Sequence, residues 1–169
     1  FTPCVNRYDL DQLDEILAAS CRVATADRHC YCKCPQPCAT GTFSGASYAS
    51  CSPCAEGSYQ DAEGKTACKI CDLGGYCKEG AVALTLCDEG SFGNVTALTS
   101  QSECHACPAG LSCAVGSTEG TPCRPGTVQP ALGQGTCDNC EAGKYQLTTG
   151  QAICIDCEGG KSSRPGATS

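Results

Sequence analysis

Cysteine is the residue that most constrains how this chain can fold. Twenty of its 169 residues are cysteine, and a share above roughly 8–10 % is typical of small disulfide scaffolds. The chain has three Phe, six Tyr and no Trp or Met, which is too few large apolar side chains to fill one core of ordinary size. We therefore expect disulfide bonds to replace most of the stabilisation that a hydrophobic core supplies, as in secreted proteins.

Charge and hydropathy exclude several classes of protein. The formal net charge is −7, with Lys and Arg scattered singly, whereas binding to nucleic acid or to an anionic membrane surface needs a basic patch. No run of apolar residues is long enough for a membrane span in this segment. The sequence opens at Phe1 without a signal region, and we interpret it as a processed piece of a longer polypeptide.

Two stretches resemble four-cysteine zinc sites, because each has two CxxC pairs separated by thirteen residues. The stretches are Cys51/Cys54 with Cys68/Cys71 and Cys137/Cys140 with Cys154/Cys157. A zinc site has no use for Cys77, Cys87, Cys113 and Cys123, which lie between the two stretches. A ladder of disulfides uses every one, so we expect bridges, with no metal and no cofactor.

An internal repeat underlies the cysteine spacing. It reads Cys-x-x-Gly-x-aromatic or apolar, followed by a polar stretch and Gly-x3-Cys, and it begins at Cys38, Cys54, Cys87, Cys123, Cys140 and, degraded, at Cys157. The first glycine suits a tight turn with positive φ. The aromatic residues Phe43, Tyr59, Phe92 and Tyr145 are expected to cover the disulfides as one-residue cores. The alternative is that they form a ligand-binding stripe.

The segment Cys54–Cys68, CAEGSYQDAEGKTAC, resembles the cysteine-rich repeats of tumour-necrosis-factor-receptor and ephrin-receptor ectodomains. Similar repeats occur in large surface proteins of protists and algae, including flagellar-hair (mastigoneme-like) proteins. The resemblance covers residues 38–169 and implies an elongated array of EGF/TNF-receptor-like modules with short hairpins and little regular secondary structure. By analogy it implies the pairs Cys38–Cys51, Cys54–Cys68, Cys140–Cys154, Cys71–Cys87, Cys77–Cys104, Cys107–Cys123 and Cys113–Cys137.

The array divides into modules 38–54, 54–71, 71–107, 107–140, 140–157 and an incomplete 157–169. Residues 1–37 form a different unit, in which Leu10, Leu13, Ile16 and Leu17 recur at helical spacing. Asp9 with Gln12 resembles a capping box, so we expect one amphipathic helix over about residues 9–20. Its apolar face caps the array or, alternatively, contacts a neighbouring subunit.

Six cysteines remain outside these pairs. Gly166-Ala-Thr-Ser169 matches the Gly-x3 that precedes a closing cysteine elsewhere, so Cys157 is expected to bond a cysteine directly after Ser169. The others are Cys4, Cys21, Cys30, Cys32 and Cys34. Because five is an odd number, one of them is expected to bond outside this segment or to stay a thiol.

The chemistry of an enzyme is missing from the sequence. The only histidines, His29 and His105, lie in no nucleophile or metal motif, so we expect no catalytic activity. Asn94-Val95-Thr96 is an N-glycosylation sequon in the longest gap of the array, between Cys87 and Cys104. We expect a glycan at Asn94 in a secreted protein.

Two functions are compatible with such an array. The first is a structural segment of an extracellular, glycosylated cell-surface stalk or filament protein, held rigid by disulfides and associating with itself or with other matrix or filament subunits. The alternative is the ligand-binding ectodomain of a receptor-like surface protein, whose most apolar run is Val82, Ala83, Leu84 and Leu86. That run is a contact strip between modules or subunits, or the filler of its own module. The absence of a clear patch favours the structural function.

Overall fold

The computed structural model describes residues 7–9, 21–23, 29–32, 37–45 and 50–169. The first three of these segments form one antiparallel sheet of β1 (Arg7–Asp9), β2 (Cys21–Val23) and β3 (His29–Cys32) in the order β1-β3-β2. Asp9, the expected N-cap of the helix over about 9–20, instead ends β1 and pairs with His29. Residues 10–20 lie outside the described part of the chain.

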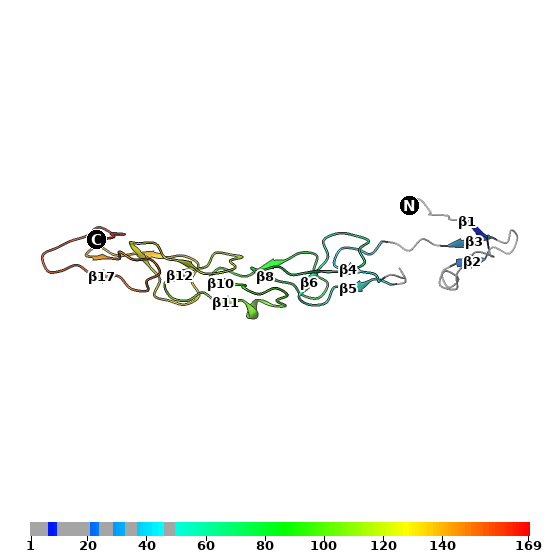
Figure 1. Cartoon of the computed structure of the whole chain (residues 1–169), viewed down its shortest axis with the longest axis horizontal. Helices are drawn as coiled ribbons and strands as arrows, with labels where there is room; N and C mark the ends of the chain where they lie inside the picture. Colours follow the sequence, from blue (N-terminus) through cyan, green and yellow to red (C-terminus); the bar gives the residue numbers. More distant parts are fainter. Residues whose placement is uncertain (1–6, 10–20, 24–28, 33–36, 46–49) are drawn as a thin grey trace.

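From residue 37 onward the described chain is a row of short antiparallel hairpins along one long axis (Figure 1). Each hairpin has two strands of two residues, and the one helical element there is the 3-10 turn η3 (Gln101–Glu103). The hairpins are β4 (Thr42–Phe43) with β5 (Ser52–Pro53), β6 (Ser58–Tyr59) with β7 (Lys69–Ile70), β8 (Gly75–Tyr76) with β9 (Thr85–Leu86), β10 (Ser91–Phe92) with β11 (His105–Ala106), β12 (Leu111–Ser112) with β13 (Thr121–Pro122), β14 (Thr127–Val128) with β15 (Asp138–Asn139), and β16 (Lys144–Tyr145) with β17 (Ile155–Asp156). This is the disulfide-rich class with short hairpins that the sequence predicts, although nothing in the described residues shows EGF-like modules.

The array from Cys38 onward divides into eight repeats, of which the first seven each contain one hairpin, and we number them 1 to 8 by their opening cysteines. These are Cys38, Cys54, Cys71, Cys87, Cys107, Cys123, Cys140 and Cys157. In every repeat the fourth residue is a glycine with positive φ, which we call the first-turn glycine. The stretches 71–107 and 107–140 therefore each contain two repeats, because Gly74 and Gly110 make the same turn after Cys71 and Cys107.

Three backbone hydrogen bonds join each repeat to the next, and they recur at all seven steps. The N–H of the first-turn glycine donates to the carbonyl of the seventh residue of the next repeat, as Gly57 does to Cys77 at 2.8 Å. The second bond begins at the seventh residue of each repeat, whose N–H donates to a carbonyl near the second turn of the following repeat. Gln60 of repeat 2 donates in this way to Ala81 of repeat 3 at 3.0 Å. The third bond runs backward, from a second-turn N–H to the carbonyl of the preceding opening cysteine.

That third bond defines the second-turn residue, the tenth or eleventh of a repeat. Its donors are Gly64, Gly80, Ala97, Gly116, Gly133, Gly150 and Gly166, and its length is 2.8–2.9 Å at every step. All seven residues have positive φ, and Ala97 at φ 62 is the only non-glycine among the described residues that does. Because each repeat binds only near neighbours, the array is quasi-one-dimensional.

Cysteine sulfur forms the interior of the rod. The side chains that are least exposed in the described residues, at below 2 %, are all cysteines: Cys54, Cys71, Cys77, Cys87, Cys107, Cys113, Cys123 and Cys140. Cys38 is also buried, at 3 %, and the only buried apolar residues there that are not cysteine are Leu98 and Val128, each at 7 %. The hydrophobic contribution is therefore spread thinly along the axis, and cross-links must supply much of the stability.

Repeats two apart also touch, at the first-turn glycines. A Cβ on Gly110 of repeat 5 would overlap the carbonyl oxygen of Gly150 in repeat 7 and would lie 2.9 Å from its carbonyl carbon. The same approach occurs at the first-turn glycines of repeats 1 to 6, whereas a Cβ on Gly143 of repeat 7 would meet nothing within 4 Å. Gly110 and Gly143 share the same φ of +83°.

We expect Gly110→Ala to destabilise the chain more than Gly143→Ala, although the backbone strain is the same at both positions. Left-handed strain costs each alanine about 1–2 kcal/mol, and the overlap with Gly150 adds about 1–3 kcal/mol at Gly110 only. Thermal unfolding of the two oxidised variants measures the difference. Equal losses would contradict the packing of repeats two apart.

Candidate functional site

Among the described residues from 37 onward, seven disulfides link fourteen cysteines, and each links two cysteines within one repeat. The bridges are Cys38–Cys51, Cys54–Cys68, Cys71–Cys77, Cys87–Cys104, Cys107–Cys113, Cys123–Cys137 and Cys140–Cys154, with Cα–Cα distances of 5.5–6.1 Å. In repeats 1, 2 and 7 the partners are the ones that the resemblance implies. In the stretches 71–107 and 107–140 the implied pairing is wrong, because no bridge there joins successive repeats. The pairs that the structure contradicts are Cys71–Cys87, Cys77–Cys104, Cys107–Cys123 and Cys113–Cys137.

The physical reason is that each repeat is cross-linked on itself before it stacks. Repeats 3 and 5 have a cysteine as seventh residue, Cys77 and Cys113, and it bonds the opening cysteine six residues earlier. The other bridged repeats bond the opening cysteine to a closing one 13–17 residues later. Chain entropy gives about 2.4 kcal/mol for the short loop and about 3 kcal/mol for the longer one, so both kinds of closure stabilise the repeat to a similar degree.

A buried glutamine takes the seventh position in repeats 2, 6 and 7. Gln60, Gln129 and Gln146 are 2–4 % exposed. Each donates from Nε2 to the carbonyl directly before the closing cysteine, at 2.6–2.8 Å, and accepts from the N–H two residues ahead, at 3.0–3.1 Å. Because a buried amide must be paired, these bonds hold the closing cysteine in place. Glutamine and cysteine at the seventh position thus both contribute to closing the repeat, the glutamine by holding the closing cysteine and the cysteine by bonding the opening one.

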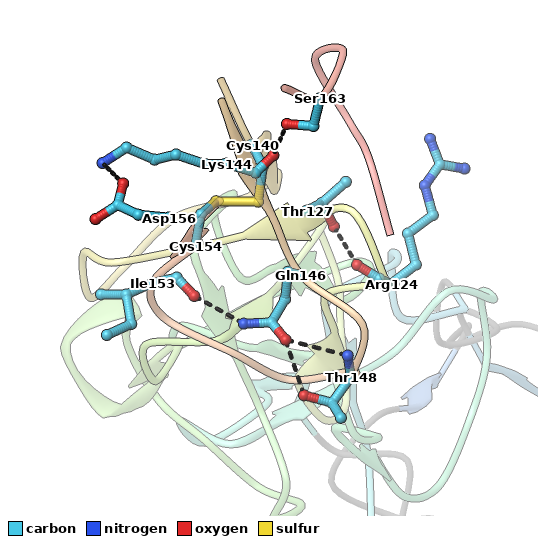
Figure 2. The surroundings of a disulfide bond; sticks show 10 residues. All are labelled: Arg124, Thr127, Cys140, Lys144, Gln146, Thr148, Ile153, Cys154, Asp156 and Ser163. Atoms are coloured by element: carbon cyan, nitrogen blue, oxygen red, sulfur yellow. Dashed lines mark hydrogen bonds and ion pairs between the residues drawn. A yellow bond between two sulfur atoms is a disulfide. The ribbon is translucent and has the colours of Figure 1, made fainter. Parts of the chain in front are cut away.

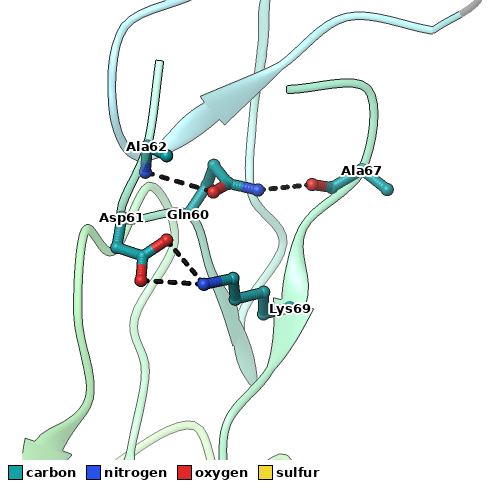
Figure 3. Close-up of polar contacts among 5 residues, drawn as sticks. All are labelled: Gln60, Asp61, Ala62, Ala67 and Lys69. Carbon is teal, nitrogen blue, oxygen red and sulfur yellow. Dashed lines mark hydrogen bonds and ion pairs between the residues drawn. The ribbon is translucent and has the colours of Figure 1, made fainter. Parts of the chain in front are cut away.

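Figure 3 shows this arrangement in repeat 2, where the amide of Gln60 lies between Ala62 and Ala67. Beside it, the Lys69 ammonium donates to both carboxylate oxygens of Asp61 at 2.7 and 2.8 Å. The hydrogen bond lowers the pKa of Asp61 and raises the pKa of Lys69. Both side chains are about half exposed, so the pair adds little to stability.

In repeat 7 the same elements surround the bridge Cys140–Cys154 (Figure 2). Gln146 binds the carbonyl of Ile153 at 2.8 Å and accepts from the N–H and the hydroxyl of Thr148. The Ser163 hydroxyl of repeat 8 donates to the carbonyl of Lys144 at 2.8 Å. A side chain of the next repeat therefore adds to the backbone bonds across this step.

The sequon lies in the repeat that departs most from the pattern. Repeat 4 spans 20 residues between opening cysteines, whereas the others span 16 or 17, and the extra length includes η3. Gln101 at its start accepts from the N–H of Asp88 at 3.1 Å and donates to Ser91 at 3.0 Å. Asn94 is exposed, and so is Thr96, directly before the left-handed Ala97. The sequon is thus accessible on an ordered turn.

The four aromatic residues of the motif are half-buried, and each faces a residue of the other strand of its hairpin. The Lys69 ammonium lies 5.7 Å from the centroid of the Tyr59 ring, and the Phe92 and His105 rings are 5.6 Å apart. Pairing across the two strands of each hairpin accounts for the positions of these aromatic side chains, so a ligand-binding stripe is not needed to explain them.

The apolar run of repeat 3 serves both purposes that the sequence left open. Leu84 packs on Gly75 within its own repeat, where its Cδ1 would lie 2.9 Å from a Cβ. Val82 and Leu86 lie beside Gly41 of repeat 1 and Gly116 of repeat 5, and they remain 51 % and 47 % exposed. The run therefore fills its module and contacts repeats on both sides.

Cys157 is the cysteine without a disulfide among the described bridges, and it is half-buried. The backbones of Cys21 and Cys32 pair in the N-terminal sheet, as do those of Val23 and Cys30. How the sulfur atoms of the five N-terminal cysteines pair lies outside the described residues. The described part of the chain also has no metal-binding cluster of His, Cys, Asp or Glu. No helix there is both long and apolar enough to cross a bilayer.

The array thus consists of cysteine-rich repeats of one geometry, and repeats 1 to 7 are each closed by a disulfide. The family model of the tyrosine-protein kinase ephrin type A/B receptor-like repeat matches residues 41–87. The resemblance to ephrin-receptor repeats is therefore confirmed for repeats 1 to 3, and the hydrogen-bond pattern of those repeats continues to repeat 8. Comparison with curated proteins gives no match. The family is a receptor-like disulfide module and not a catalytic fold.

Trypsin can distinguish the two pairings of repeat 3. Cleavage after Lys69 and Lys78 isolates peptide 70–78, which contains both Cys71 and Cys77, and the next cleavable site is Lys144 because Pro125 follows Arg124. We expect a denatured, unreduced digest to release 70–78 alone, lighter by one pair of hydrogen atoms than after reduction. Recovery of 70–78 joined to peptide 79–144 would support the pairs Cys71–Cys87 and Cys77–Cys104 instead.

Proposed function

We propose that the chain is a structural segment of an extracellular, glycosylated cell-surface stalk or filament protein. The observation that carries this proposal is the regularity of the steps: the same three backbone hydrogen bonds join every pair of successive repeats from 38 to 169. A row of domains on free linkers would bend at each linker. Continuous bonding instead favours a stiff rod, which suits a part that spans distance.

Two further features support an extracellular location. The seven disulfides of the array, which lie between Cys38 and Cys154, persist only in an oxidising environment. Short loops closed by buried bridges also leave few extended segments for a protease. We propose that the partners are covalent glycans and other subunits of the same extracellular assembly.

Stiffness is the first test of this function. A compact domain of the same length would have a radius of gyration of about 15 Å. We expect X-ray scattering of the oxidised chain to give a far larger value with a constant rod cross-section, and reduction of the disulfides to abolish the cross-section signal. Scattering typical of hinged beads in the oxidised chain would contradict a rigid stalk.

The state of the protein at its source distinguishes the stalk from the receptor. We expect the chain to be recovered from the cell surface in polymers or large assemblies. Recovery as monomers that bind one soluble protein tightly would support a receptor ectodomain and contradict the structural function.

We also propose that Asn94 carries the glycan. Expressed in secretory cells, the chain is expected to lose mass on treatment with an N-glycosidase, which leaves Asp at position 94. Asn94→Gln should abolish the shift, whereas Asn139→Gln, outside any sequon, should keep it. A wild-type chain without an N-linked glycan would refute the assignment.

A further inference from the structure

Six equivalent joints occur where repeats two apart touch, and each joint exposes three variable side chains. Two of them belong to the earlier repeat of the joint, of which they are the third and the last residue. The third one belongs to the later repeat and directly precedes its second-turn residue. At the joint of repeats 3 and 5 these residues are Leu73, Leu86 and Val115. The Cδ2 of Leu86 would lie 3.0 Å from a Cβ on Gly116, and a Cβ on Gly74, next to Leu73, would meet the carbonyl of Gly116.

All three side chains at this joint are large, aliphatic and exposed, at 44 % for Leu73, 47 % for Leu86 and 59 % for Val115. No other joint has that composition. At the other joints the three residues are Thr40, Pro53 and Glu79 (repeats 1 and 3), Glu56, Ile70 and Thr96 (2 and 4), Glu89, Ala106 and Leu132 (4 and 6), Ala109, Pro122 and Thr149 (5 and 7), and Pro125, Asn139 and Pro165 (6 and 8). Five joints therefore pack without an aliphatic trio, so stacking of the repeats does not require one.

The charge around this joint also differs from the rest of the array. Residues 79–123 contain no Lys or Arg, and they contain five exposed carboxylates: Glu79, Asp88, Glu89, Glu103 and Glu119. All ion pairs in the described part of the chain lie on either side of this stretch, within residues 61–69 and 144–161. The stretch that carries Leu86 and Val115 thus has a net negative charge that no ion pair of the described chain neutralises.

We infer that Leu73, Leu86 and Val115 form a docking surface, here called the aliphatic joint, for a basic protein segment with apolar side chains. Exposed apolar residues rimmed by charge mark interaction sites, and complementary charge steers and orients the partner. A second copy of this chain is a poor occupant, because its own array carries the same negative band. The inference does not rest on the structural function, since a stalk subunit and a receptor ligand can both supply such a segment.

Defined peptides test this surface on the full oxidised chain, labelled for NMR. Three short probes are compared: one alternating Lys and Leu, one alternating Lys and Ser, and one alternating Glu and Leu. We expect only the Lys/Leu peptide to shift the methyl signals of Leu73, Leu86 and Val115 strongly, and we expect binding to weaken as ionic strength rises. Equal binding of the Lys/Ser peptide would show that charge alone acts and would overturn the proposal.

Two variants and one control distinguish binding at the aliphatic joint from nonspecific binding to any exposed apolar residue. Leu73→Thr and Val115→Thr are each expected to weaken binding of the Lys/Leu peptide about tenfold, because each removes an apolar anchor. Leu132→Thr alters the position equivalent to Val115 in the joint of repeats 4 and 6, and it should leave binding unchanged. An equal effect of Leu132→Thr, or shifts spread over all repeats, would refute a single docking surface.

Unchanged melting temperatures for these variants confirm that folding is intact, because the side chains are exposed. Sedimentation of the chain alone tests the remaining occupant. We expect a monomer, whereas dimers that Val115→Thr dissociates would show that a second copy occupies the joint and would overturn the choice of a basic partner.

Discussion

The hydrogen bond between each opening cysteine and the next repeat is the interaction on which the rod depends. The carbonyl of an opening cysteine accepts the second-turn N–H of the following repeat, while its sulfur is bonded within its own repeat. One residue therefore couples the closure of a repeat to its stacking. Because the sulfur is buried and covalently held, the carbonyl is presented in a fixed direction. The order of the array follows from this local constraint, with almost no apolar core.

This coupling explains why repeats of different sequence stack alike. Whether the seventh residue is Gln60 or Cys77, its N–H and C=O make the same bonds to the neighbouring repeats. The side chain only decides how the repeat is closed, by a buried amide with a distant disulfide or by a short disulfide. The three extra residues of repeat 4 lie between the second turn and the closing cysteine, where η3 lies. The backbone hydrogen bonds between successive repeats are thus the same although the side chains and the loop of repeat 4 differ.

The class of fold could be read from the cysteines and glycines, because a turn glycine three residues after a cysteine is a local signal. The disulfide partners of the longer stretches could not. Cys71 and Cys107 open repeats with the same Cys-x-x-Gly spacing, but the nearby Cys77 and Cys113 made these stretches resemble a larger module with crossed bridges. Only the backbone bonds from Gly74 and Gly110 reveal the repeat boundary. The helical spacing around Leu10 likewise said nothing of the strand that ends at Asp9.

The aliphatic joint could not be predicted from the sequence either, because its three residues lie far apart in the chain. Leu73 and Leu86 stand near opposite ends of repeat 3 and Val115 belongs to repeat 5, and contact between repeats two apart brings them together. In a globular protein such a trio would be ordinary core. In a rod whose interior is cysteine there is no core for it to join, so its side chains remain in water at a cost of about 25 cal/mol per Å² of apolar surface. Each of the five other joints exposes at most one large aliphatic side chain, Ile70 or Leu132, so the cost is concentrated at this joint, which is the physical reason to connect it with a partner.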